Sequence, residues 1–389
     1  RVDGRYNNGI LAVNGANVET HSDTSFDLPS TSAGLAMDAS GNPFSNYGNN
    51  GINMGSSAGK ATVEDTSFSV AGSGNGILIN SGTMTNKVTG STFNVTSGNG
   101  ININIGGVTD VTSSANKASS FTVGNGNGIY AATGTKLDNV TATFSITGTN
   151  SNGILKNTAN NTKVIGSTFT VGGTGSTGIT YNGGSAAEVI TGSKFDVNGR
   201  TNATNGTTSG INMINTEQIT VNPNTDFNVN GSAIGIEVHN NALQEKKIVF
   251  TGSPTTGWTN MTLSGNNNVG VNIVDGAMNS GNTKHKVNLA GNSNEYGLDM
   301  TIVSNNNVGY YNRGFAEELI IKSGKDPINT NSSSKYGRIK IGDSTYTPAK
   351  GYDDNVIFAN AAYVKSGTVD FKQIEIDGNR NTIAYFAPG

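Results

Sequence analysis

Two apolar signatures recur along this chain with the same period of about 25 residues. The first is a Thr/Ser-x-Phe-x-Val segment, found at 66–70, 91–95 and 167–171. The second is an Asn-Gly-Ile triplet, found at 75–77, 99–101, 127–129 and 152–154. A repeat of this length is one supersecondary unit, which buries its apolar side only by stacking on its neighbours. The chain is therefore expected to fold as a stack of such units.

Alternation within the unit predicts which side chains point inward. In the segment around Phe68, the inward positions are Thr66, Phe68 and Val70, and the residues between them are polar. The Asn-Gly-Ile element reads as a second strand. A third apolar position, such as Val63, lies five residues before the Phe. An odd spacing within one strand would turn that side chain outward, so we expect a bend or bulge between the two.

Three short strands in each unit, joined by Gly and Asn corners, predict an all-β fold: a parallel β-helix. Gly and Asn tolerate the left-handed backbone that such corners need. Stacked asparagines such as Asn75 and Asn99 are expected to form side-chain ladders from coil to coil. An α-helical reading is rejected because the apolar residues show no 3.6-residue period.

The regular pattern divides the chain into two parts of one solenoid. Residues 1–314 read as regular coils with insertions at 199–209 and 240–268, and residues 315–389 as continuing, more decorated coils. Function is expected where the period breaks, at those insertions and beyond residue 322, because the coil itself is explained as scaffold.

Composition limits the classes of partner. Charged residues make up 13% of the chain and the net charge is −3, which argues against nucleic acid because phosphate neutralisation needs clustered Lys and Arg. The chain has no cysteine, yet its Asn-, Thr- and Gly-rich composition is typical of an exported surface. No apolar run of membrane-spanning length is present in the sequence. A start at Arg1 without a signal peptide predicts a mature fragment, and we expect a monomer.

Several motif-like strings are better explained by the coil. The Gly173-x-Gly175-x-x-Gly178 spacing falls at a corner rather than between a strand and a helix, as a dinucleotide site would require. The β-helical pectin hydrolases carry Asn-Thr-Asp, Asp-Asp, Gly-His-Gly and Arg-Ile-Lys in that order. This chain carries Asn-Thr-Asp at 224–226 and Arg-Ile-Lys at 338–340. However, its Asp-Asp at 353–354 follows the Arg-Ile-Lys motif instead of preceding it, and Gly-His-Gly is missing. Asp226 also falls at an outward strand position. No catalytic, cofactor-binding or metal-binding residue is therefore predicted.

A few aromatic and basic residues outside the repeat are the candidates for ligand binding. Trp258, the one tryptophan, can serve as a platform for a sugar ring or a receptor, or can cover an edge of the helix. Tyr346 and Tyr352 flank Lys350 in a polar segment and offer the same two readings.

The repeat style resembles that of one protein family. Asn-Gly-Ile and Val-Gly-Val/Tyr markers, Thr-x-Phe-x-Val strands and the lack of cysteine are similar to the passenger domains of monomeric autotransporters, above all the large fusobacterial outer-membrane adhesins. The segments Asn-Asn-Val-Gly-Val-Asn at 267–272 and Asn-Val-Gly-Tyr-Tyr-Asn at 307–312 resemble the later coils of these adhesins most. The resemblance implies a right-handed parallel β-helix on the bacterial surface, anchored at the outer membrane or released.

Three functions follow as hypotheses. The first is a non-enzymatic adhesin segment that attaches to a host receptor or glycan, or to partner bacteria. The second is a β-helical polysaccharide-active enzyme or a tailspike-like protein, which should show carboxylates that converge with raised pKa values. The third is a structural spacer within a larger protein.

Overall fold

A computed structural model describes residues 8–28, most of 49–274 and separate strands up to residue 386. Within 49–274 the residues outside the description are 56–57, 81–84, 105–107, 116, 133, 158–160, 184–187, 200–206, 240–245, 252–255, 258 and 266. Beyond 274 the described segments are 287–288, 298–302, 307–312, 319–323, 339–341, 359–364, 367–371, 374–376 and 382–386. All 35 elements of the described part are strands.

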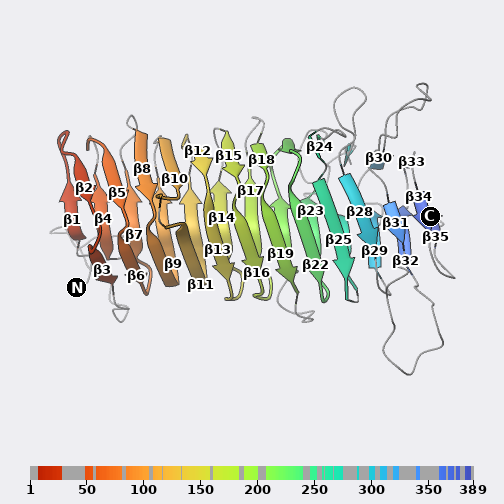
Figure 1. The fold of residues 1–389 in the computed structure, drawn as a ribbon, viewed down its shortest axis with the longest axis horizontal. Coiled ribbons are helices and arrows are strands. Elements are labelled where there is room, and N and C mark those ends of the chain that lie inside the picture. Colours follow the sequence, from red (N-terminus) through yellow and green to blue (C-terminus); the bar gives the residue numbers. More distant parts are fainter. Residues whose placement is uncertain are drawn as a thin grey trace, which may run out of the picture.

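The strands form a parallel β-helix with three strands in each coil (Figure 1). Each strand pairs in parallel with the equivalent strand of the next coil, as β13 does with β16 and β14 with β17. Three sheets result, and we name them by their main inward residue. The coils succeed one another along the long axis from the N-terminus to the C-terminus (Figure 1). The predicted fold class is confirmed.

The Val sheet holds twelve strands. They are β2 (Val18–Thr20), β5 (Ala61–Glu64), β8 (Thr85–Thr89), β10 (Val108–Thr112), β12 (Lys136–Val140), β15 (Thr162–Ile165), β18 (Glu188–Thr191), β21 (Gln218–Val221), β24 (Lys246–Phe250), β27 (Val287–Asn288), β30 (Leu319–Ser323) and β33 (Gly367–Phe371).

The Phe sheet and the Ile sheet are joined because β9 (Thr92–Ile103) and β11 (Ser119–Ala131) run through both. The other Phe-sheet strands are β3 (Ser25–Leu28), β6 (Ser67–Val70), β13 (Ala142–Ile146), β16 (Thr168–Val171), β19 (Lys194–Asn198), β22 (Asp226–Asn230), β25 (Thr259–Ser264), β28 (Leu298–Ile302), β31 (Ile339–Ile341) and β34 (Ile374–Ile376). The other Ile-sheet strands are β1 (Asn8–Ala12), β4 (Asn50–Met54), β7 (Asn75–Ile79), β14 (Asn152–Asn157), β17 (Thr177–Asn182), β20 (Ser209–Met213), β23 (Ile234–His239), β26 (Val269–Val274), β29 (Asn307–Asn312), β32 (Ala359–Val364) and β35 (Thr382–Phe386).

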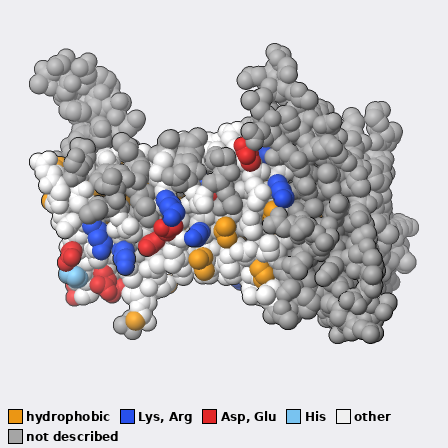
Figure 2. Space-filling view, turned by 90° about the horizontal axis from the view of Figure 1, so that it is seen from above, with side chains coloured by type: hydrophobic (Ala, Val, Ile, Leu, Met, Phe, Trp, Pro, Cys, Tyr) orange, Lys and Arg blue, Asp and Glu red, His pale blue; other side chains and the backbone are white. Residues whose placement is uncertain are grey.

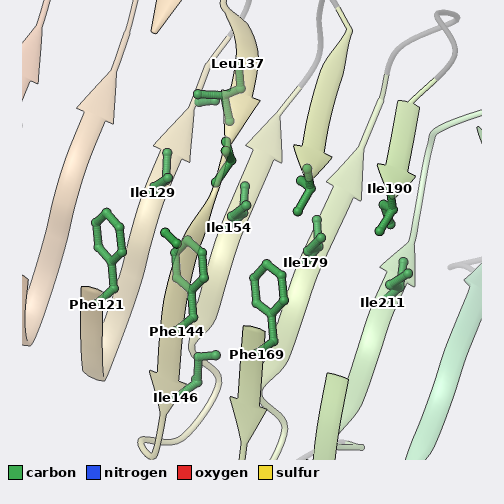
Figure 3. Packing of buried hydrophobic residues seen from close by; sticks show 14 of the residues in the cluster. Phe121, Ile129, Leu137, Phe144, Ile146, Ile154, Phe169, Ile179, Ile190 and Ile211 are labelled. Carbon is green, nitrogen blue, oxygen red and sulfur yellow. The ribbon is translucent and has the colours of Figure 1, made fainter. Parts of the chain in front are cut away.

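The repeated Phe residues stack as a single column inside the Phe sheet. Consecutive rings lie 4.6 to 5.1 Å apart between centroids and within 9° of parallel. The column consists of Phe26, Phe68, Phe93, Phe121, Phe144, Phe169, Phe195 and Phe227. Figure 3 shows three of these rings beside isoleucines of the Ile sheet and side chains of the Val sheet, within one continuous interior.

Polar columns run parallel to the apolar ones. The Nδ2 group of Asn99 donates to Asn75 Oδ1 at 2.9 Å, and Asn127 repeats this contact with Asn99 at 2.8 Å. The expected asparagine ladder is therefore confirmed, and it extends from Asn8 to Asn152. Four buried serines, each two residues before a Phe, accept a backbone N–H group from the coil before, as Ser167 Oγ does from Ala142 at 3.1 Å; the others are Ser91, Ser119 and Ser193.

The glycine of Asn-Gly-Ile lies within a strand, and close packing explains why it must be glycine. A Cβ at Gly153 would approach the carbonyl oxygen of Gly178 to 2.6 Å and the ring of Phe169 to 3.0 Å. Left-handed backbone occurs at the corners of the coils, for example between the Val and Phe sheets at Gly166 with φ 61°. This corner is the bend expected between Val164 and Phe169.

The stretch 240–268 departs from the expected insertion. It contains β24 and β25, which pair with β21 and β22 in the ordinary positions of a coil. Met261 takes the place of the Phe, in register with Phe227, so the sequence marker is lost while the strand remains. Of the predicted insertion at 199–209, residues 200–206 lie outside the described part.

The glycine contact yields a direct test. Replacing Gly153 by Ala should lower the free energy of unfolding by about 1–3 kcal/mol, because the added methyl group has no space between the carbonyl and the ring. Gly172→Ala is the matched control, since a Cβ there meets nothing within 4 Å. Thermal and urea denaturation of both variants measure the difference. Equal loss in the two variants would contradict the packing explanation.

Candidate functional site

The four residues predicted to bind a ligand lie outside the described residues. These are Trp258, Tyr346, Lys350 and Tyr352. Trp258 directly precedes β25, whose first residue, Thr259, is buried. Their role therefore stays a prediction, and the described part offers three other groups of polar side chains.

The outer face of the Val sheet carries a pair of carboxylates at a β-bulge. The register between β10 and β12 shifts after Thr109, so that Asp110 pairs with Asn139 and Asp138 becomes the extra residue. Lys136 Nζ lies 2.6 Å from Asp138 Oδ1. Bulges redirect side chains, and here the bulge brings a second carboxylate near Asp110. Figure 2 shows acidic and basic side chains mixed over the N-terminal half of one face of the rod.

Asp110 is the group in this pair with altered acidity. Partial burial and then the charge of Asp138 raise its pKa, while Lys87 and Lys136 act in the opposite direction. One oxygen of the carboxylate, Oδ1, is buried without a hydrogen-bond partner in the described structure. A carboxyl group of this kind stays protonated to a higher pH than an ordinary aspartate, which is the property expected of a general acid.

The outer face of the Phe sheet carries a second polar group, the Phe-sheet strip, formed by Lys194, Asp196, Asp226, Asn228 and Asn260. Lys194 Nζ lies 2.8 Å from Asp196 Oδ2. Asn228 donates to Asp196 Oδ1 and Asn260 donates to Asp226 Oδ1, both at 2.7 Å. The side-chain hydrogen bond and charge of Asp196 raise the pKa of Lys194. The prediction that Asp226 points outward is confirmed, and its partner is an amide rather than a second acid.

The third group lies in the interior, where sequence analysis expected only apolar and small residues. Lys156 and Glu188 form a buried ion pair. Lys246, equally buried, donates through Nζ to the carbonyl oxygens of Thr216 at 2.9 Å and Ile214 at 3.4 Å. Sequence analysis missed these residues, although the repeat carries the signal: Lys156 stands two residues after Ile154, where Ile79 and Ile103 follow their own triplets.

The described residues lack two further features. They contain no group of three or more His, Asp or Glu side chains placed to hold a metal ion. A helix with the length and apolar character of a membrane span is likewise missing from them.

No family model, curated protein or solved structure matches this chain. The fold is therefore established by the structure itself, and the function has to be argued from its surfaces.

Asp110 generates a prediction about acidity and stability. Because its folded pKa lies above the usual 3.8, the folded state binds the proton more tightly than the unfolded chain does. The contribution of Asp110 to stability therefore grows as pH falls through this raised pKa, and is unfavourable at neutral pH. Asp110→Asn should raise the free energy of unfolding at pH 7 by about 0.5 kcal/mol. It should also reduce the contribution to stability that Asp110 makes in the wild-type protein as pH falls. Asp27→Asn, at an exposed strand position, is the control in pH-dependent denaturation.

Lys246 generates the opposite dependence on the alkaline side. Burial lowers its pKa from 10.5 to about 8, and the charge of Glu217 only partly opposes this. Between these two values the unfolded chain holds more protons than the folded one, so stability should rise with pH across that window. Lys246→Met should remove part of this rise, whereas the exposed Lys163→Met should leave it unchanged. An unchanged slope in Lys246→Met would show that its ammonium group is not desolvated.

Proposed function

We propose that this chain is a segment of a surface-exposed adhesin of the autotransporter passenger type, which attaches to host cells or to other bacteria. The observation that supports it most is the uninterrupted stacking of coils around a buried apolar core, with mostly polar residues at the outward positions. From β4 to β26 each Ile-sheet strand continues the register of the one before it. Such a rod holds a binding surface at a fixed distance from its anchor.

The polar side chains of the Phe-sheet strip favour a polar ligand. Its carboxylates and amides lie on successive coils, which in a β-sheet are about 4.8 Å apart. Rows of this kind can hydrogen-bond the hydroxyl groups of a glycan that lies along the rod. The strip lies on β19, β22 and β25, the coils that border 200–206 and Trp258, where the sequence predicts that function concentrates.

A polysaccharide-active enzyme is the second candidate, and one observation favours it. Asp110 and Asp138 are neighbouring carboxylates, one with a raised pKa, as an enzyme of this class requires. However, Asp138 is neutralised by Lys136, and the pair lies on the outward face of the Val sheet. We therefore favour attachment over catalysis as the function. The spacer hypothesis applies if the fragment binds nothing.

Binding of the purified fragment to a glycan array and to host cells tests the proposal. Trp258→Ala should weaken binding about tenfold or more if the tryptophan is an aromatic anchor, because such anchors carry most of the energy of an interface. Tyr130→Ala, an aromatic change on the outer face of the Ile sheet, is the control and should bind normally.

Three outcomes separate the candidate functions. Normal binding by Trp258→Ala would remove this residue from the site, and absence of binding by the parent fragment would favour the spacer. Release of reducing ends from a bound polysaccharide, abolished by Asp110→Asn, would favour the enzyme.

A further inference from the structure

Lys156 and Glu188 face each other inside the β-helix from two different sheets. Lys156 lies in β14 of the Ile sheet and Glu188 in β18 of the Val sheet, and the chain between them makes one full coil. Their side chains are 1% and 0% exposed, respectively, in the described structure. An ion pair with so little access to water is rare in a protein interior, because both charges lose their hydration.

The pair is chemically isolated. Lys156 Nζ contacts Glu188 Oε1, and neither atom has a hydrogen-bond partner elsewhere among the described residues. The other carboxylate oxygen, Oε2, accepts the backbone N–H of Thr162 at 2.7 Å. Coil by coil, Lys156 is stacked between Ala131 and Tyr181.

The surroundings of the pair are apolar. Ile154 lies two residues before Lys156, Ile190 lies two residues after Glu188, and Ile179 pairs with Ile154 in the next coil. All three are fully buried, and Figure 3 shows them in the shared interior. In such a medium two separate charges cost more than an amine and a carboxylic acid, because the neutral forms need no hydration. Burial lowers the pKa of Lys156 to about 8, so its amine form is accessible near neutral pH.

We propose that Lys156 and Glu188 condense into an intramolecular isopeptide bond, which links consecutive coils of the β-helix. A buried lysine amine is a competent nucleophile, and two reactants fixed in contact gain a large effective concentration. The product is a neutral amide, which removes both charges from the core. The reaction depends on the fold alone and does not rest on what the rod binds.

The steps balance without a further reactant. A proton passes from the Lys156 ammonium to Oε1 of Glu188, which leaves a neutral amine and a neutral acid. The amine lone pair then attacks Cδ, and the negative charge that develops on Oε2 is held by the N–H of Thr162. The C–Oε1 bond breaks as Oε1 takes a second proton from the attacking nitrogen, and one water molecule leaves. An N–Cδ amide remains, with Oε2 as its carbonyl oxygen.

Lys246 provides an internal comparison. It is buried to the same extent and its pKa is also lowered to about 8. Its Nζ, however, faces the carbonyl oxygens of Thr216 and Ile214, which are backbone amides and not acids. Burial of a lysine alone should therefore not produce a bond, and the carboxyl group in contact with it decides the reaction.

Intact-mass spectrometry of the purified folded protein tests the proposal. The mass should be lower than that of the sequence by one water molecule, and trypsin should release a branched peptide that joins the segments containing Lys156 and Glu188. Lys156→Met and Glu188→Leu should each show the full mass of their sequences, whereas Lys246→Met should keep the loss of water. Circular dichroism establishes that each variant is folded.

A refolding experiment covers the case in which the variants do not fold. Wild-type protein isolated unfolded in urea should have the full mass and should lose water only after transfer to native conditions. A folded wild-type protein that keeps its full mass would overturn the proposal, because the pair would then be a purely ionic contact. Loss of water in the Lys156→Met variant would overturn it as well.

Discussion

The whole structure depends on the close contact between a phenylalanine ring and the glycine of the triplet that packs against it. Each ring fills the space that a glycine without Cβ leaves open, as Phe169 does against Gly153. Because the next coil repeats both residues in register, rings stack on rings and glycines on glycines. A side chain at the glycine position would push the two sheets apart. This constraint keeps a glycine opposite the ring throughout the Phe column.

Stacking like on like also allows polar groups into the interior. A buried asparagine costs free energy when it is alone, but in a column each one donates to the amide oxygen of its neighbour. The buried serines satisfy backbone N–H groups of the preceding coil in the same way. Lys156 and Glu188 differ, because no copy of either stands above or below them. Each is therefore paired with the other across the interior and not with a copy in its own column.

Most of the fold could be predicted from the sequence because the interactions that form it repeat. The register of Phe and Ile, the bend before each Phe and the asparagine ladder follow from periodicity. Periodicity fails where one coil uses a different residue for the same position, and Met261 concealed a regular coil for this reason. Periodicity also predicts where a residue lies within its coil but not which residue of another coil it contacts. The proximity of Asp110 and Asp138 depends on a bulge that the sequence does not reveal.

The same distinction separates scaffold from function. A residue that is repeated in every coil is explained by stacking, so its presence says nothing about a ligand. Lys194 and Asp226 stand at an outward position where most other coils carry Ser or Thr, as Thr168 does, and no packing requirement accounts for the change. Their described contacts are with one another along the outer face of the sheet and not with the core, so we interpret this change in chemistry as an adaptation to the medium or to a partner. The Phe-sheet strip is therefore the described surface on which a ligand of the rod is expected to act.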